Sequence, residues 1–332
     1  MDLPLNQILQ GNSLEVLQTL PDKSINTCIT SPPYFGLRDY GVDGQIGLEG
    51  DVEEFVQSLV DLFKEVKRVL KDDGTVWLNL GDTYWGGGWR NDMIREGSGD
   101  IQQGHKGTHD ATQIKNATGN HPIYKSKDLM GVPWKVAFAL QEDGWYLRQD
   151  IIWHKPNPMP ESVKDRCTKN HEYIFLLSKS KKYYFDYESI KEDAVYTDNR
   201  KGKGRLLYNG KRSEDTEKNG QNAFVKIDGK RNKRSVWTVT TKPYKGAHFA
   251  TFPEDLIEPC VLAGSPEDGV VLDPFMGSGT TAIVSTKNKR NYIGIELNPE
   301  YIDIAKQRLQ PVEKQQEKEL ITEGILNKFF DV

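Results

Sequence analysis

The sequence predicts an α/β domain with a mostly parallel central sheet, and three observations support this fold class. Apolar runs of strand length alternate with segments whose apolar residues recur at helical spacing. The run VVLDPFMGSGTTAIV joins a buried strand to a helix through a glycine-rich turn, which is typical of nucleotide-binding α/β folds. The length of 332 residues allows one large domain or two, with a substantial core.

Each predicted element follows from its local pattern. The first helix has Ser13 as its expected N-cap, because serine commonly occupies that position and the helical apolar spacing begins there. The run VEEFVQSLVDLFKEVKRVL places apolar side chains on one face of a longer helix. We predict strands at 6–11, 24–30, 75–82, 145–155, 171–180, 269–273 and 291–297. We predict helices at 13–20, 52–70, 128–144, 253–264, 280–289 and 299–309, followed by a charged, helix-prone tail.

Composition excludes several classes of protein. No apolar run approaches the roughly 18 residues of a spanning helix, so no membrane partner is expected. The start, MDLPLNQILQ, has no basic and apolar signal-peptide pattern. Cys28, Cys167 and Cys260 form neither a metal-ligand pattern nor an even disulfide set. These observations favour a reducing, cytoplasmic location and no bound metal.

Charge and composition single out two irregular segments. Residues 196–245 hold 14 Lys or Arg against 5 Asp or Glu, so this stretch carries +9 and the rest of the chain −13. Such a basic segment predicts a surface for a polyanion, and a solvated loop is the alternative. Residues 85–128 are rich in Gly, Asn, His and Thr without apolar periodicity, which indicates either a functional loop or disorder.

The late glycine turn predicts a nucleoside site. Gly277, Gly279 and Ala282 satisfy the pattern G-x-G-x-x-A, and glycines let a ligand approach the backbone closely. Glu296 ends the next strand 19 residues after Gly277, where a carboxylate can accept hydrogen bonds from ribose hydroxyls. The alternative is a tight turn that only packs the helix on the sheet.

Two features favour S-adenosylmethionine over a dinucleotide. The strand ends in Asp273-Pro274-Phe275, which places an acid and an aromatic ring beside the turn, and an acid suits a cationic ligand. The unit also lies late in the chain, after a full α/β half, whereas dinucleotide-binding domains usually begin with it.

The run TSPPYF, together with this turn, resembles the amino-group DNA methyltransferases that modify cytosine N4 or adenine N6. The tetrapeptide SPPY comes first, a variable region follows, and the cofactor turn comes last, an order similar to the β class. The resemblance extends over most of the chain through GNSLEVL, GTVWLNLGD, DIIWHKPNPMPES, HEYIFLL, FATFPEDLIEP and YIGIEL. It implies a Rossmann-like, S-adenosylmethionine-dependent methyltransferase fold with permuted motif order and an inserted target-recognition region.

The resemblance also implies roles for individual residues. The expected catalytic residues are Ser31, Pro32, Pro33 and Tyr34. The expected cofactor-binding residues are Asn12, Phe249, Pro253, Asp273, Phe275, Gly277, Ser278, Gly279, Thr280 and Glu296. Asn12 departs from the family pattern, which often has Asp there to contact the adenine, and we expect its amide oxygen to accept instead.

The resemblance also divides the chain into regions. These are a catalytic half (1–84), a flexible glycine-rich loop (85–128), a continuation of the catalytic domain (129–185), a DNA target-recognition region (186–245), a cofactor-binding half (246–311) and a helical tail (312–332). The expected partner is double-stranded DNA, and a cognate restriction endonuclease is left open as a genetic rather than physical partner. The expected DNA-binding residues are Arg200, Lys201, Lys203, Arg205, Lys211, Arg212, Lys230, Arg231, Lys233 and Arg234.

The doubled proline of SPPY suits chemistry on an aromatic amine. Such an amine attacks poorly because its lone pair is delocalised, and acceptors around its N–H groups make it pyramidal. The Ser31 hydroxyl and the Pro32 carbonyl are adjacent acceptors, and Pro33 restricts Pro32 to an extended conformation. Tyr34 offers a face on which an extruded base can stack. The alternative is a strand-ending turn with Tyr34 in the core.

Several functional alternatives remain open from the sequence. Serine at the first position favours cytosine N4, whereas aspartate is commoner in the family for adenine N6. An RNA or protein methyltransferase, or an inactive DNA-binding homologue, is the further alternative. Methylation of cytosine C5 is not expected, because Cys260 follows the only proline before a cysteine and lies in a predicted helix, where we expect a core residue.

Overall fold

The computed structural model describes residues 3–36, 42, 44–86, 121–193, 229–242 and 252–330. The chain divides into two compact units, one formed by Met1–Asp186 with Ser235–Val332 and the other by Tyr187–Arg234. No helix among the described residues is long and apolar enough to cross a membrane.

The larger unit is built on an eight-stranded sheet with the order β1-β10-β9-β2-β3-β5-β4-β8. Within the described ranges, neighbouring strands of this sheet are parallel except where β5 pairs with β3 and β4. The prediction of a mostly parallel sheet is therefore confirmed. The strands are β1 (Gln7–Gln10), β2 (Ile25–Thr30), β3 (Leu70–Leu80), β4 (Tyr146–His154), β5 (His171–Ser178), β8 (Val236–Thr238), β9 (Val270–Asp273) and β10 (Asn291–Glu296).

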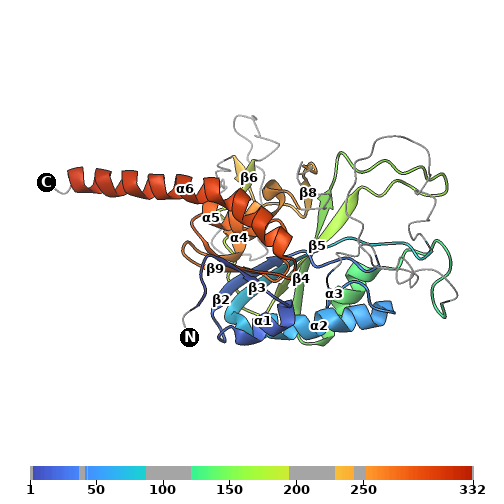
Figure 1. The fold of residues 1–332 in the computed structure, drawn as a ribbon. Coiled ribbons are helices and arrows are strands. Elements are labelled where there is room, and N and C mark those ends of the chain that lie inside the picture. The colour runs from blue at the N-terminus through green and yellow to red at the C-terminus, as the bar shows by residue number, and fades with distance from the viewer. Residues whose placement is uncertain are drawn as a thin grey trace, which may run out of the picture. The chain divides into compact units, whose positions relative to one another are not determined.

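Helices cover both faces of the sheet. Figure 1 shows α1, α2 and α3 on one side and α4, α5 and α6 on the other. The sheet is thus sandwiched between two helical layers, which explains why β2 and β9 are almost wholly buried on both faces. The helices are α1 (Ser13–Thr19), α2 (Val52–Val69), α3 (Val132–Glu142), α4 (Glu254–Gly264), α5 (Thr280–Lys287) and α6 (Pro299–Phe330).

The long helix α2 shows how the sequence fixes one layer. Asp51 caps it by accepting a hydrogen bond from the Glu53 backbone, and its apolar side chains form a buried stripe. Arg68, in its last turn, donates to the carbonyls of Leu17 and Leu20. These bonds satisfy acceptors at the C-terminal end of α1 and so tie α1 to α2.

The N-cap prediction for α1 was wrong by one residue. Asn12 is the cap, and its Oδ1 accepts from the backbone of Leu14 at 2.9 Å and of Glu15 at 3.4 Å. Ser13 is the first helical residue, and its buried hydroxyl instead donates to the Pro274 carbonyl at 2.6 Å. The serine thus joins α1 to the segment that follows β9.

The structure differs from the predicted regions at two boundaries, and it shows how the ends of a third region are held. Residues 236–238, expected in the recognition region, form β8 and pair with β4 in the main sheet. Helix α6 continues past Pro311, so the described part of the expected tail is not a separate element. The predicted loop 85–128 is held at its ends, because Trp85 stacks on Tyr124 and exchanges backbone hydrogen bonds with residues 127 and 128. Residues 87–120 lie outside the described residues.

The described part of the smaller unit contains a short antiparallel pairing of two strands. Strands β6 (Glu192–Asp193) and β7 (Lys230–Arg231) are antiparallel. The Glu192 carboxylate accepts from both Arg231 and Arg234 at 2.9 Å. Two of the expected DNA-binding cations are therefore paired within this unit.

Candidate functional site

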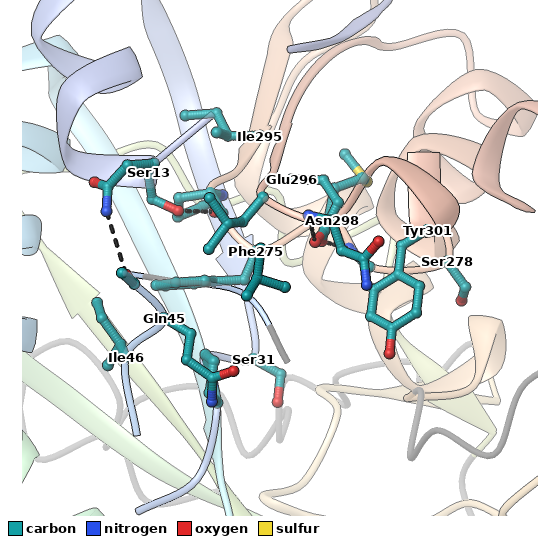
Figure 2. Close-up of a pocket in the computed structure, with 18 of the residues that line it drawn as sticks. Ser13, Ser31, Gln45, Ile46, Phe275, Ser278, Ile295, Glu296, Asn298 and Tyr301 are labelled. Atoms are coloured by element: carbon teal, nitrogen blue, oxygen red, sulfur yellow. Dashed lines mark hydrogen bonds between the residues drawn. The ribbon is translucent and has the colours of Figure 1, made fainter. Parts of the chain in front are cut away.

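A cavity of about 160 Å³ lies where several parallel strands end. Because the carboxyl ends of parallel strands meet at one edge of a sheet, ligands of open α/β folds bind in the crevice there. Figure 2 shows Glu296, Asn298 and Tyr301 on one side of the cavity and Ser31, Gln45 and Ile46 on the other. The predicted residues that line it are Asn12, Ser31, Pro33, Phe275, Gly277, Ser278, Thr280 and Glu296.

The glycine turn after β9 needs its glycines for two different reasons. Gly277 and Gly279 have φ angles of +51° and +84°, a region that other residues rarely adopt. Gly277 borders the cavity. A Cβ on Gly279 would lie 2.8 Å from the Ala305 Cβ, so this glycine allows α6 to pack against the start of α5. Gly279 is therefore placed behind the turn and not on the cavity wall.

Glu296 stands at the end of β10 with its carboxylate held by the backbone. One oxygen accepts from the Gly277 N–H at 2.8 Å and the other from the Asn298 N–H at 2.8 Å. Burial raises the pKa of Glu296, and the N–H groups of Asn298, Gly277 and Leu297 oppose this rise. Each carboxylate oxygen keeps a further lone pair, so the group can accept two more hydrogen bonds from a ligand in the cavity.

Asp273 lies beneath the cavity and does not line it. It is 1% exposed, and its carboxylate accepts from Thr30 Oγ1 at 2.7 Å, Thr281 Oγ1 at 2.5 Å and the Phe275 N–H at 3.0 Å. The bond to Thr30, the residue before Ser31, holds the two separate motifs side by side. Burial raises the pKa of Asp273 to about 6; the hydrogen bonds from Thr281, Thr30 and the Phe275 backbone oppose the rise.

This raised pKa predicts a pH-dependent contribution to stability. The folded chain keeps the Asp273 proton up to about pH 6, whereas an unperturbed aspartate releases it near 3.8. The free energy of unfolding that Asp273 contributes is therefore greatest below pH 3.8 and falls as pH rises through 6, by about 3 kcal/mol in total. Asparagine does not titrate, so the unfolding free energy of wild type minus that of Asp273→Asn should decrease from pH 4 to pH 7.

Urea unfolding at four pH values in this range measures that difference. Asp268→Asn is the matched control, because Asp268 is exposed just before β9. A difference between wild type and Asp273→Asn that stays constant over pH would contradict the assignment.

The tetrapeptide follows β2 and spans two environments. Ser31 and Pro33 line the cavity, and Pro32 between them is buried. The Ser31 hydroxyl has no hydrogen-bond partner among the described residues. Tyr34 lies outside the cavity lining, and its hydroxyl donates to Glu172 at 2.9 Å. The tetrapeptide therefore leads from the cavity to a separate polar cluster.

The remaining predicted cofactor-binding residues are Asn12, Pro253 and Phe249. Asn12 lines the cavity, but its oxygen is used to cap α1, and its amide nitrogen lies 3.4 Å from the Gly44 carbonyl. Pro253 is the N-cap of α4 and Phe252, its neighbour, lines the cavity instead. Phe249 lies outside the described residues.

Several lining residues were not predicted. Six of these thirteen residues come from residues 42–46 and from the start of α6, neither of which has a motif. Asn298 and Pro274 had a usable signal, since each lies within two residues of a predicted acid. The unpredicted lining residues are Ser13, Val42, Gly44, Gln45, Ile46, Phe252, Pro274, Met276, Ile295, Leu297, Asn298, Tyr301 and Ile304.

Four of the ten expected DNA-binding residues lie among the residues that the structure describes. Lys230, Arg231, Lys233 and Arg234 lie in the smaller unit. The other six, Arg200, Lys201, Lys203, Arg205, Lys211 and Arg212, lie outside the described residues. Cys260 is 1% exposed within α4, in agreement with its predicted place in the core.

A second hollow of about 980 Å³ is lined by residues that follow β3 and by the connection between β4 and β5. Lys169 lies in it and donates to the Asp82 carbonyl at 2.8 Å. Burial lowers the pKa of Lys169, and the neighbouring Asp82 and Glu172 oppose this. Arg166 lies over the Tyr84 ring, 4.1 Å from its centroid.

Known proteins with similar sequences are DNA methylases and Type II methyltransferases. The family model described as DNA methylase matches residues 25–307. The Type II methyltransferase M.Cfr9I of Citrobacter freundii is 48% identical over 305 residues, which are 91% of this chain and 87% of that protein.

Two solved structures share the fold. The PvuII DNA methyltransferase, described as cytosine-N4-specific, matches with a TM-score of 0.62 at 18% identity, covering 94% of this chain and 91% of that one. A candidate DNA modification methylase from Thermus thermophilus, complexed with S-adenosyl-L-methionine, matches with a TM-score of 0.53 at 24% identity, covering 92% and 95%.

Proposed function

Because this chain belongs to the N6/N4 DNA methylase family, we propose that it transfers the methyl group of S-adenosylmethionine to the exocyclic N4 amine of cytosine in double-stranded DNA. One observation carries the proposal. A single cavity is lined both by Ser31 and Pro33 of the tetrapeptide and by Gly277 and Glu296 of the nucleoside motif. The Ser31 hydroxyl, a proposed acceptor for the amine, thus lies in the same cavity as the proposed site of the methyl donor.

The cavity has the chemical features that S-adenosylmethionine requires. The Glu296 carboxylate retains lone pairs for the two ribose hydroxyls, as described above. Phe275 and Ile295 supply apolar surface for the adenine, and the glycine turn leaves the backbone accessible. When bound, S-adenosylmethionine supplies a methyl group already activated on a sulfonium. Asp273 takes part by holding Thr30 and the Phe275 backbone in place.

Ser31 and Pro32 prepare the attacking amine. The serine hydroxyl oxygen and the proline carbonyl oxygen accept from the two N–H groups, which directs the nitrogen lone pair toward the methyl donor. Pro32 has no N–H and a fixed φ, and Pro33 restricts its conformation, so the carbonyl is oriented before the base arrives. This preorganisation avoids reordering the acceptors during the reaction.

The target base must leave the duplex before it can reach these acceptors. Extrusion costs a few kcal/mol, which contacts to the DNA backbone and to neighbouring bases offset. We assign stacking of the extruded base to Tyr34. The basic region 186–245, with the ten Lys and Arg residues named above, is the proposed contact surface for DNA. Arg231 and Arg234 would exchange their Glu192 partner for phosphate.

Two observations favour cytosine N4 as the methylated amine. Serine at the first position of the tetrapeptide favours it, and the solved PvuII enzyme that shares this fold is described as cytosine-N4-specific. Adenine N6 is the second candidate, because its amine offers the same two N–H groups. The Type II names of the relatives also support a restriction endonuclease as genetic partner.

Transfer of label from tritiated S-adenosylmethionine tests the substrate class. The full chain is incubated in parallel with unmethylated bacterial chromosomal DNA, total RNA and a protein extract. Label should enter DNA alone, and heat-inactivated protein should transfer none. Label in RNA or protein, or failure of the chain to bind S-adenosylmethionine, would contradict the proposal.

A further inference from the structure

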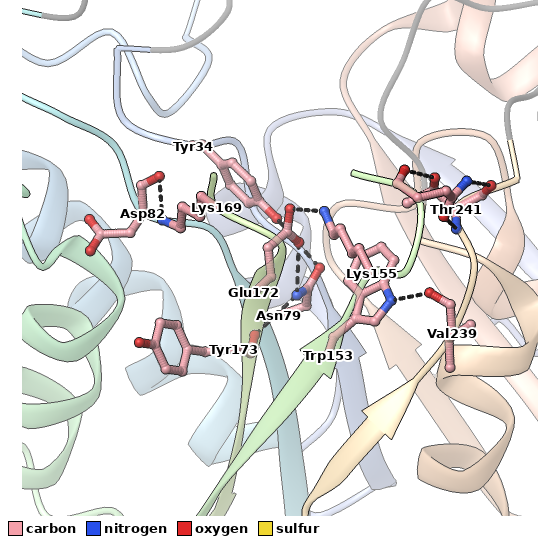
Figure 3. Close-up of polar contacts among 11 residues, drawn as sticks. Tyr34, Asn79, Asp82, Trp153, Lys155, Lys169, Glu172, Tyr173, Val239 and Thr241 are labelled. Atoms are coloured by element: carbon pink, nitrogen blue, oxygen red, sulfur yellow. Dashed lines mark hydrogen bonds and ion pairs between the residues drawn. The ribbon is translucent and has the colours of Figure 1, made fainter. Parts of the chain in front are cut away.

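We infer that Glu172 is a positioning residue that holds the Tyr34 ring ready for the extruded base. The Tyr34 hydroxyl donates to Glu172 Oε2 at 2.9 Å, whereas Asn79 Oδ1 is at 3.5 Å and so a weaker acceptor (Figure 3). Glu172 is the second residue of β5 and Tyr34 follows β2, with β3 between these strands in the sheet. This inference rests on the proposed function, in which Tyr34 stacks on the target base.

Glu172 is itself fixed by two further contacts. Lys155 donates to its other carboxylate oxygen, and both side chains of this ion pair are less than one-fifth exposed. The Asn79 amide lies 3.3 Å from the same oxygen that Tyr34 uses, and it also donates to the Tyr173 carbonyl at 3.0 Å. Charge-assisted bonds of this kind are stronger than neutral ones, so the acceptor for Tyr34 is held firmly.

Lys155 is also restrained on its other side. Its ammonium lies 4.1 Å from the centroid of the Trp153 ring, and the Trp153 indole donates to the Val239 carbonyl at 2.8 Å. The cluster therefore reaches from the tetrapeptide to the residue that follows β8. A tyrosine needed only for core packing would not require a charged acceptor supported in this way.

The Tyr34 ring is also confined by the backbone at Gly81. A Cβ at Gly81 would lie 2.6 Å from Tyr34 Cε2, closer than any real side chain allows. The ring thus rests on a glycine at one edge and is tethered by its hydroxyl at the tip. Both restraints are made by the chain itself, so the orientation of the ring does not depend on contacts from the base.

A double-mutant cycle between Tyr34→Phe and Glu172→Ala tests this inference. Phenylalanine keeps the stacking ring and removes only the hydroxyl. Each single variant should lower kcat on unmethylated chromosomal DNA by about tenfold to a hundredfold, the range for one lost hydrogen bond to a charged group. The dissociation constant for S-adenosylmethionine should not change, because neither residue lines the cavity.

The kcat of the double variant decides whether Glu172 acts through the Tyr34 hydroxyl. If Glu172 acts through the Tyr34 hydroxyl, the double variant should be no slower than the slower single variant. Glu65→Ala is the matched control: Glu65 is a partly buried glutamate paired with Arg68 on α2, and its removal should leave kcat unchanged. If Glu172→Ala does not fold, the same cycle is run with Glu172→Met, which has a similar side-chain volume and no oxygen acceptor for the Tyr34 hydroxyl.

Two results would overturn the inference that Glu172 positions Tyr34. A third result would contradict the proposed function instead. Full kcat in Tyr34→Phe, or effects that multiply in the double variant, would show that Glu172 does not position Tyr34. Absence of DNA methylation by the wild-type chain would contradict the proposed function itself, and the wild-type arm of each assay reveals this separately.

Discussion

Replacing Ser31 with alanine is expected to lower the turnover number for DNA methylation by about a hundredfold to a thousandfold, as loss of one preorganised polar group does in other active sites. The hydroxyl has no partner among the described residues and borders the cavity, so its expected use is toward the incoming amine. The carbonyl of Pro32 would then act alone. Binding of S-adenosylmethionine, measured by calorimetry, should stay within about twofold of wild type, because no assigned cofactor contact is removed.

Ser24→Ala provides the control for this experiment. Ser24 lies just before the other end of β2, and its hydroxyl donates to the Pro21 carbonyl at 2.8 Å in an exposed turn. This variant should keep wild-type turnover. Full activity in Ser31→Ala would refute the role of the serine, and a parallel loss of cofactor binding would place the serine in the cofactor site instead.

Replacing Glu296 with alanine is expected to weaken S-adenosylmethionine binding by at least about a hundredfold. Two hydrogen bonds from ribose hydroxyls to a carboxylate are lost, each worth roughly 1.5–3 kcal/mol. The backbone N–H groups of Gly277 and Asn298 also lose their acceptor, which loosens the turn that borders the ligand. Isothermal titration calorimetry measures the change directly.

The matched control is Glu300→Ala, four residues away. Glu300 is exposed in the first turn of α6 and does not line the cavity. Its removal should leave the dissociation constant unchanged. An affinity in Glu296→Ala equal to that of wild type would contradict the assignment of Glu296 to the ribose.

Much of the fold could be predicted because local patterns agree with it. Strand β9 is a short, mostly apolar run, and α2 has a clear apolar stripe with acids at its start and cations at its end. The glycine turn and Glu296 could also be placed, since a strand, a turn, a helix and an acid at fixed spacing define their own geometry.

Other parts of the site depend on long-range contacts that no local pattern records. The Thr30–Asp273 hydrogen bond joins residues that are 243 positions apart in the chain. Asp273, which we expected to bind the cofactor, is buried and holds Thr30 in place instead. The contact between Tyr34 and Glu172 arises because β5 enters the sheet antiparallel, beside β3. Asn12 caps α1 in place of the predicted Ser13, whose hydroxyl bonds the Pro274 carbonyl, a contact between segments far apart in the chain.

The central claim is tested most directly by identifying the methylated nucleoside. The full chain is incubated with unmethylated chromosomal DNA and S-adenosylmethionine carrying a deuterated methyl group, with Ser31→Ala in parallel. The DNA is then digested to nucleosides and separated by liquid chromatography with mass detection. We predict deuterium in N4-methyl-2′-deoxycytidine, and far less of it with Ser31→Ala. Deuterium in N6-methyl-2′-deoxyadenosine, or in no nucleoside at all, would contradict the account.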